Sequence, residues 1–379
     1  MKIQNAIMLL LGFSFFISCS GSDDDSAGGG GNPQNIKIMK ASASLFNSYF
    51  LDSNGNVYGC GANSSHQMNI SASGNQYKPT KIIDHVNRVA AGEEFTLFLK
   101  NDGSLWGVGR NDYGQLGTGN TNQQDTAVKL AEGIKFMAAG KDYSFIIKND
   151  NSLWASGKNT FGQLGNGNTE NQNSFVKIMD DVKTVATSGT GMISGGHTLI
   201  LDNGEKLWAC GENSSFQLGD GTDINRQLPV QIADGVSQIS CGAQFSIFLK
   251  NDGSLWGTGF NGAGQLGDGT VYTVHVPKQL MTSVKEIGAG QGHTLALKTD
   301  GSVWASGLND NGQLGNGGNS NLLSFEKTAD GVIGLTAGNY HSLLIKTDGS
   351  VFSAGSNGSG QLGLGQGISG SFEFKKIEF

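Results

Sequence analysis

Histidines are the first residues to consider for chemistry, because an imidazole can bind a metal ion or move a proton near neutral pH. Three of the six histidines share one slot, eleven residues before a recurring aromatic residue: His197, His293 and His341. That slot elsewhere holds Phe95, Tyr143 and Phe245. A position that accepts Phe, Tyr or His is explained by packing, so we expect buried imidazoles there and no metal site.

The cysteines offer a second kind of chemistry, as thiolate nucleophiles, metal ligands or disulfides. Cys60 and Cys210 share a slot two residues after the recurring aromatic residue, and Cys241 stands where other copies have alanine. Their spacing matches no zinc motif, and all three are interpreted as small, buried strand residues. Cys60 and Cys210 are not expected to pair, whereas pairing of Cys210 with Cys241 is left open.

Carboxylates recur in tight turns, at Asp102, Asp252, Asp300 and Asp348, where aspartate is a common turn residue. The Asp-Gly-Thr runs at Asp220 and Asp268 lack the alternating spacing of a calcium loop. No residues combine as nucleophile, base and orienting group. The sequence therefore predicts a protein that is not an enzyme and needs neither metal nor cofactor.

These residues are positioned by a repeat. An aromatic residue recurs at positions 58, 106, 154, 208, 256, 304 and 352, in steps of 48 residues with a single step of 54. A glutamine follows each aromatic residue by nine positions. We interpret this glutamine as a residue that ties down its own loop. Seven copies at a nearly fixed period indicate a repeat architecture.

One repeat, residues 86–133, predicts four short strands. Residues 86–92 and 95–100 form two of them, and Asn101-Asp102-Gly103 is a hairpin turn. Residues 104–109 form the third, with Trp106 and Val108 on one face and two glycines on the other. Residues 127–130 form the fourth. The fold class is all-β: a seven-bladed β-propeller of four-stranded antiparallel blades, preferred over an open solenoid. Residues 36–39 and 372–379 supply the first and last strands, but the way the ring closes is not predicted.

The N-terminus lies outside the repeats. Residues 1–18 combine Lys2, an apolar run and Ser18 before Cys19, which resembles the signal peptide of a bacterial lipoprotein. The alternative is an ordinary secretory signal with an incidental cysteine. Residues 19–35 form a flexible Asp- and Gly-rich tether after the lipidated Cys19, and residues 36–379 form the propeller. The acidic residues 23–25 favour the cell surface over the periplasmic leaflet of the outer membrane, which is the alternative.

The repeat itself resembles a known family. Residues 290–295 read Gly-Gln-Gly-His-Thr-Leu, and the segment continues to Gly-Gln-Leu-Gly at 312–315. This pattern is similar to the repeat of the regulator-of-chromosome-condensation family across about residues 36–379. The resemblance implies a seven-bladed propeller. The founding member is a nuclear exchange factor, an activity that we do not transfer, because a fold does not fix a function. A secreted bacterial propeller that inhibits β-lactamases is closer in context.

Departures from the repeat locate the candidate binding site. Six extra residues fall within 187–195, in the connection between two strands at one rim. We therefore select Thr187, Ser188, Gly189, Thr190, Gly191 and Met192 as candidate rim residues, because variable loops on a constant scaffold commonly bind ligands. A neutral loop insertion is the alternative. Tyr113 and Phe161 precede their Gly-Gln-Leu-Gly turns and are expected to form a partly exposed aromatic arc. Packing beneath their own loops is the alternative.

The net charge and the fraction of charged residues limit the class of partner that the protein can bind. The net charge is −7 and only 15% of residues are charged, which argues against binding of nucleic acid. We expect a monomeric, non-enzymatic scaffold that is membrane-anchored at the cell envelope and binds an unknown protein or glycan. The alternative is an inhibitor of an extracellular or periplasmic enzyme. An enzyme or a lectin-like accessory protein is less favoured.

Overall fold

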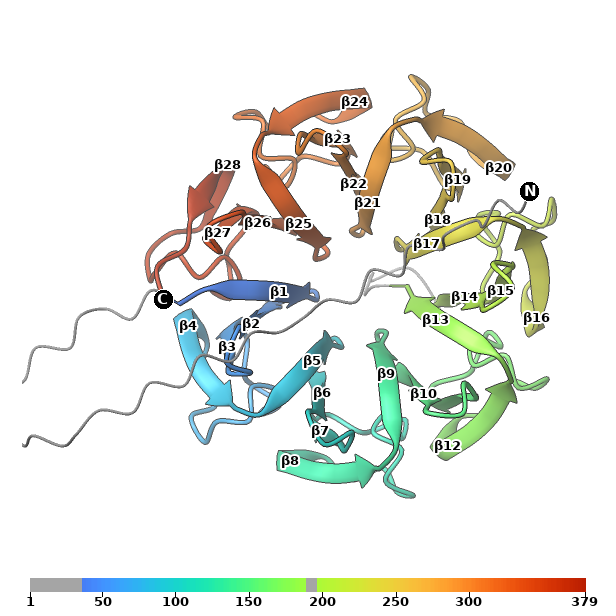
Figure 1. The fold of residues 1–379 in the computed structure, drawn as a ribbon, viewed down its shortest axis with the longest axis vertical. Helices are drawn as coiled ribbons and strands as arrows, with labels where there is room; N and C mark the ends of the chain where they lie inside the picture. The colour runs from blue at the N-terminus through green and yellow to red at the C-terminus, as the bar shows by residue number, and fades with distance from the viewer. Residues whose placement is uncertain (1–35, 189–195) are drawn as a thin grey trace, which may run out of the picture. The chain divides into compact units, whose positions relative to one another are not determined.

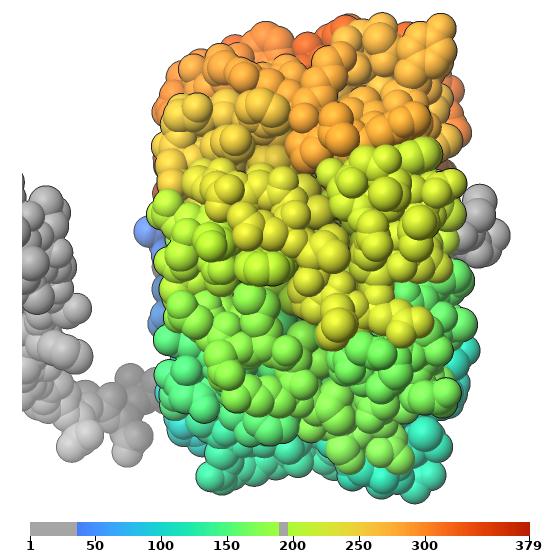
Figure 2. Space-filling model, turned by 90° about the vertical axis from the view of Figure 1, so that its right-hand side faces the viewer, coloured from blue at the N-terminus to red at the C-terminus, as the bar shows by residue number. Residues whose placement is uncertain are grey.

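The computed structural model describes residues 36–188 and 196–379, which form one compact unit. Its strands pair into seven four-stranded sheets, and each sheet is the blade of a propeller (Figure 1). From the side, neighbouring blades abut as bands of successive sequence (Figure 2). In these two segments no helix is long and apolar enough to cross a bilayer. The seven-bladed, all-β propeller is confirmed.

The blades follow one another along the chain. Blade 1 contains β1 (Ile38–Ala43), β2 (Asn47–Asp52), β3 (Val57–Gly61) and β4 (Gln76–Ile83). Blade 2 contains β5 (Val86–Ala91), β6 (Phe95–Lys100), β7 (Leu105–Gly109) and β8 (Gln124–Ala131). Blade 3 contains β9 (Ile134–Ala139), β10 (Tyr143–Lys148), β11 (Leu153–Gly157) and β12 (Gln172–Met179). Blade 4 contains β13 (Val182–Thr187), β14 (His197–Asp202), β15 (Leu207–Gly211) and β16 (Arg226–Ala233).

The remaining three blades repeat this plan. Blade 5 contains β17 (Val236–Cys241), β18 (Phe245–Lys250), β19 (Leu255–Gly259) and β20 (Val274–Met281). Blade 6 contains β21 (Val284–Ala289), β22 (His293–Lys298), β23 (Val303–Gly307) and β24 (Leu322–Ala329). Blade 7 contains β25 (Val332–Ala337), β26 (His341–Lys346), β27 (Val351–Ser356) and β28 (Gly370–Lys376). The first strand of each blade lies innermost and the fourth outermost (Figure 1).

The fourth strand is longer than the sequence indicated. In blade 2 it spans Gln124–Ala131, whereas the alternation of residues had predicted only 127–130. The pairing of β7 with β8 shifts register between Leu105 and Trp106 and again between Gly107 and Gly109. Such irregularities interrupt the two-residue alternation while the backbone pairing continues. Polar residues at the start of the outer strand therefore belong to it.

The hydrophobic cores lie between neighbouring blades. Trp106 and Val108 face the core shared with blade 1, as expected from their alternation in β7. On the opposite face of β7, a Cβ added to Gly107 would lie 2.6 Å from Leu130 and 3.0 Å from Leu116. The bare glycine thus admits leucines of its own blade, including one from the Gly-Gln-Leu-Gly turn. Repetition of this packing between successive blades makes the ring one continuous structure.

The recurring glutamine ties its loop to itself and to the next blade. In all seven copies its side-chain oxygen accepts the backbone N–H two residues earlier, as Gln115 does from Tyr113. The loop-tying interpretation is confirmed. In six of the copies its backbone carbonyl also accepts a hydroxyl from the following blade, as Gln115 does from Ser144 at 2.6 Å. The same contact between Ser48 and Gln361, 2.7 Å long, joins blade 1 to blade 7.

The ring closes without a strand shared between its two ends. β1 and β25 lie side by side, and the Ile38 N–H donates to the carbonyl of Gly349 at 3.2 Å. Ile38 and Phe50 of blade 1 pack in one cluster with Leu343 of blade 7. The expected first and last strands are present as β1 and β28. Their bounds differ from the expected 36–39 and 372–379, and closure excludes an open solenoid.

Candidate functional site

The candidate site lies on the rim where each blade has two of its strand connections. Because the strands are antiparallel, the connection from first to second strand and that from third to fourth share this rim. Thr187 ends β13, and Ser188 follows it as a buried residue at the start of the inserted connection. Gly189, Thr190, Gly191 and Met192, also selected from the sequence, lie outside the described residues.

The central channel opens at this rim into a cavity of about 170 Å³. All seven blades line it, mainly through the last residues of their innermost strands: Ala43, Ala91, Ala139, Thr187, Cys241, Ala289 and Ala337. Among the described residues that line this opening the side chains are small, and none is charged. Thr187 places the start of the insertion at the mouth of the channel.

Charged side chains gather on the rim of blades 2 and 3. Arg110 follows β7, and its guanidinium lies 3.1 Å from Glu94, 2.6 Å from Asp112 and 3.8 Å from Asp142. Burial disfavours the charge on Arg110, but these carboxylates outweigh it and raise the pKa of the guanidinium. The network therefore joins both connections of blade 2 to blade 3.

Blade 3 extends the network through two lysines. Lys158 lies 3.6 Å from Asp142, whose side chain is only 4% exposed. Lys141 lies 3.7 Å from Glu93, across the boundary between the blades. Desolvation raises the pKa of Glu93, and the charge of Lys141 opposes that shift. These ion pairs hold connections from two blades in one arrangement.

Tyr113 lies between two cations of this network. The guanidinium carbon of Arg110 is 5.8 Å from its ring centre, and the ammonium of Lys158 is 5.1 Å away. Both Tyr113 and Phe161 are half-buried residues. A cation near an aromatic face is stabilised by the ring electrons. The arrangement can offer an aromatic face and charges of both signs to a polar partner.

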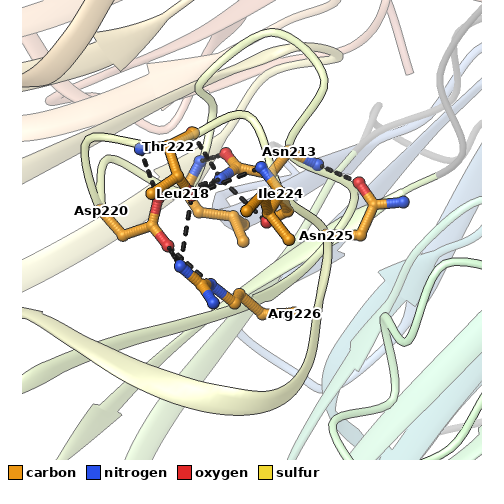
Figure 3. A network of polar contacts seen from close by, with 7 residues as sticks. All are labelled: Asn213, Leu218, Asp220, Thr222, Ile224, Asn225 and Arg226. Carbon is orange, nitrogen blue, oxygen red and sulfur yellow. Dashed lines mark hydrogen bonds and ion pairs between the residues drawn. The ribbon is translucent and has the colours of Figure 1, made fainter.

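The buried asparagine of each repeat was missed by reasoning from the sequence. Asn213 accepts the N–H of Leu218 at 2.9 Å and donates to the carbonyl of Thr222 at 2.7 Å (Figure 3). Its position five residues after the aromatic residue, repeated in all seven copies, was the available signal. The side chain replaces backbone partners that the long outer loop cannot provide.

Asp220 completes this loop and is a structural residue. It accepts hydrogen bonds from Asn213 and Thr222 and lies 2.6 Å from Arg226 (Figure 3). Burial would raise its pKa, but the hydrogen bonds from Thr222, Arg226 and Asn213 hold that pKa below its usual value. Asp268 repeats the arrangement with Thr270 and Lys278. Within the described segments, no three His, Cys, Asp or Glu residues form a possible metal site.

The three histidines of the shared slot are structural. His341 Nε2 lies 2.8 Å from Ser48 Oγ, and that hydroxyl donates to the carbonyl of Gln361. Nε2 must therefore carry the proton that it shares with Ser48. His197 and His293 make the same contact with Ser246 and Ser342. Burial lowers the pKa of His197 and His293 to about 3 and that of His341 to about 4.

The cysteines and turn carboxylates also belong to the scaffold. Cys60, Cys210 and Cys241 are buried, free thiols, so the pair Cys210–Cys241 left open by the sequence is not a disulfide. Burial raises the pKa of Cys210 to about 12. Asp102 accepts the Ser104 N–H and hydroxyl, which holds the pKa of this carboxyl below its usual value.

Comparison with family models identifies the repeat. The model for the regulator of chromosome condensation (RCC1) repeat matches residues 86–115, 134–163, 236–265, 284–313 and 332–361. A second model of this repeat matches residues 102–147, 205–249, 252–297 and 300–345, and together they cover more than half of the chain. The chain belongs to the RCC1 repeat family. The matches omit blade 1, where Ser44 stands in a slot that holds glycine in blade 2.

Solved structures share the propeller of this RCC1-repeat chain. Prp20p from Saccharomyces cerevisiae, described with its binding properties to Gsp1p and histones, is 20% identical with a TM-score of 0.75. That match covers 91% of this chain and 88% of the other. Human WBSCR16 is 21% identical with a TM-score of 0.72, over 82% and 86% of the two chains. No curated protein sequence matches this chain. At this identity the likeness shows the fold alone.

Proposed function

We propose that this RCC1-repeat protein is a non-enzymatic binding scaffold, anchored at the bacterial cell envelope, that holds a protein or glycan on one rim. The network around Tyr113 carries the proposal. It brings Arg110, Lys158 and their carboxylates together on two adjacent blades. The slot of Arg110 holds Phe260, Leu308 and Ser356 in blades 5 to 7. A ring that repeats its interior but concentrates charge in one sector is suited to asymmetric recognition.

The chemistry of this sector favours a polar partner with its own charges or hydroxyls. Tyr113 is a half-buried aromatic residue, and Asp112 and Lys158 supply an acceptor and a donor beside it. The insertion after Thr187 starts on the next blade of the same rim. The partner would thus contact blades 2 to 4. The connections of blades 2 and 3 that it meets are already held together by ion pairs.

Anchoring is tested in cells by the substitution Cys19→Ala. The proposal expects wild-type protein in the membrane fraction and the variant in the soluble fraction, since a lipidated cysteine supplies the anchor. Protease added to intact cells should remove the wild-type protein if it is displayed on the surface. A Cys19→Ala variant that stays in the membrane fraction contradicts lipid anchoring. Protection from protease in intact cells contradicts surface display.

Binding is tested by affinity capture from envelope and secreted fractions with the wild-type chain and with Tyr113→Ala. A protein or glycan retained by wild type and lost by Tyr113→Ala supports the rim site. Equal retention by both chains contradicts it. Capture of an enzyme, with stoichiometric loss of that enzyme's activity, would assign the alternative inhibitory function to the same rim.

A further inference from the structure

A second cavity lies in the central channel, away from the candidate rim. Its volume is about 310 Å³, and it is lined by the early and middle residues of β1, β5, β21 and β25 and by Ile345 of β26. These innermost strands face one another around the channel (Figure 1). The size is at the lower end of the roughly 300–1,000 Å³ found for small-molecule pockets. The cavity therefore has room for a small ligand.

Two cations occupy one side of this cavity. Lys40 and Arg88 hold the same slot, the third residue of the innermost strand, in adjacent blades. Lys40 donates to the carbonyl of Asn87 at 3.3 Å, which places its ammonium beside Arg88. Desolvation lowers the pKa of both groups, and their mutual repulsion adds to the shift of Lys40. Two cations held together in this way favour an anion between them.

Arg88 has no carboxylate partner among residues 36–188 and 196–379, unlike Arg110 on the rim. Its guanidinium carbon lies 4.5 Å from the centre of the Phe136 ring. Stacking on an aromatic face orients a guanidinium while leaving its N–H donors available. A planar carboxylate can take two of these donors at once. Arg88 is thus oriented for a carboxylate that the chain itself does not supply.

A carboxyl group lines the cavity from another blade. Glu286 of β21 holds the same third slot and accepts the N–H of Leu335 at 3.3 Å. Desolvation raises its pKa, so a cationic partner would stabilise its ionised form. Gly334 fills this slot in the intervening blade 7, and a Cβ there would meet only Ile345, at 3.9 Å. The glycine leaves open space between the blades that carry Glu286 and Lys40.

We propose that this cavity binds a small zwitterion, an amino acid or a dipeptide. Its carboxylate is bound by Arg88 and Lys40, and its ammonium group by Glu286. Gly334 provides the space that the ligand crosses. This site is separate from the rim, because it shares no lining residue with the rim cavity and includes no residue of the Arg110 network. It makes the scaffold a receptor for a small molecule in addition to any macromolecular partner.

The probe is glycylglycine, titrated into the purified chain at constant ionic strength while the melting temperature is measured. A ligand that binds only the folded state raises the melting temperature saturably. N-acetylglycylglycine lacks the ammonium group, and glycylglycine amide lacks the carboxylate. Both analogues are expected to bind at least about tenfold more weakly, since each loses a charge-assisted contact. No rise with glycylglycine, or equal rises with all three compounds, would overturn the proposal.

Variants test the recognition of the ligand's carboxylate and of its ammonium group separately. Arg88→Gln should abolish discrimination against the amide, and Glu286→Gln should abolish discrimination against the acetylated compound. Gly334→Val keeps every charge but fills the space, so it should abolish binding of glycylglycine. Lys183→Gln removes an exposed cation from β13 outside the cavity lining and should bind as wild type. Wild-type binding by Gly334→Val, or loss of binding by Lys183→Gln, contradicts the assignment. Circular dichroism of each variant establishes that the fold is retained.

Discussion

The two rims of the propeller use similar side chains for different purposes. One rim, called the hairpin rim here, is formed by the turns between the second and third strands. There the Ser104 hydroxyl donates to Asp102 and accepts the indole N–H of Trp106, and the Lys100 ammonium lies 4.5 Å from the centre of the Trp106 ring. Blades 3, 5 and 6 repeat this set with the same residue types. On the opposite rim, Arg110 and Tyr113 form a network that blades 5 to 7 do not repeat. Repetition therefore marks the scaffold, and departure from repetition marks the candidate site.

The largest effect on stability is expected at a scaffold glycine, which is compared with a control glycine in a loop. Gly307 has φ of +100°, and an added Cβ would lie 2.4 Å from the carbonyl oxygen of Gly292. Gly307→Ala should lower the free energy of unfolding by at least about 3 kcal/mol or prevent folding. Gly358→Ala, with no atom within 4 Å, should change it by less than about 0.5 kcal/mol. Denaturant unfolding measures both; similar losses would contradict the distinction.

A buried loop asparagine should give the next largest effect. Asn213→Ala removes the acceptor of the buried Leu218 N–H and the donor to the half-buried Thr222 carbonyl, leaving both groups without this partner. We expect a loss of about 2–3 kcal/mol in unfolding free energy. Asp223→Ala, an exposed change in the same loop, is the control and should be nearly neutral. An equal effect of the two changes would show that Asn213 does not organise the loop.

The shared histidine slot should make stability depend on pH. The folded pKa of His341 is about 4, below the unfolded value of about 6.5, so the unfolded chain binds more protons as pH falls below 6.5. Between pH 7.5 and 5.5 this histidine should cost about 1.4 kcal/mol of stability. His341→Phe, the residue type found in blades 2 and 5, should remove that part of the loss. Unfolding of both proteins at the two pH values measures it, and an unchanged difference would contradict the buried, neutral imidazole.

The smallest effect on stability is expected on the variable rim. Arg110→Gln breaks partly exposed ion pairs, which contribute about 0–1 kcal/mol each. The unfolding free energy should therefore fall by no more than about 1 kcal/mol in total, while the affinity for the partner falls. A larger loss of stability would mean that Arg110 belongs to the scaffold, and the contrast between the rims would fail.

The fold was predictable because its signals repeat. Trp106, the Asn-Asp-Gly turn and Gln115 recur in register, so spacing alone indicated seven blades. The Arg110 network was not predictable, because its members come from four connections that meet only after neighbouring blades pack. Lys40, Arg88 and Glu286 share a slot, but each differs from its equivalents, and only the closed ring brings them to one cavity. Tyr113 was identified because its position, just before the Gly-Gln-Leu-Gly turn, varies from copy to copy.

The central claim is that the varied rim of blades 2 and 3 binds the partner and that the repeated rim does not. The most direct measurement compares the affinity of the captured partner for wild type, Arg110→Gln/Lys158→Gln and the hairpin-rim variant Asp252→Asn. The account predicts at least about a tenfold loss for the double variant, from two lost charged contacts, and wild-type affinity for Asp252→Asn. Equal affinity of all three proteins, or a loss confined to Asp252→Asn, would contradict it.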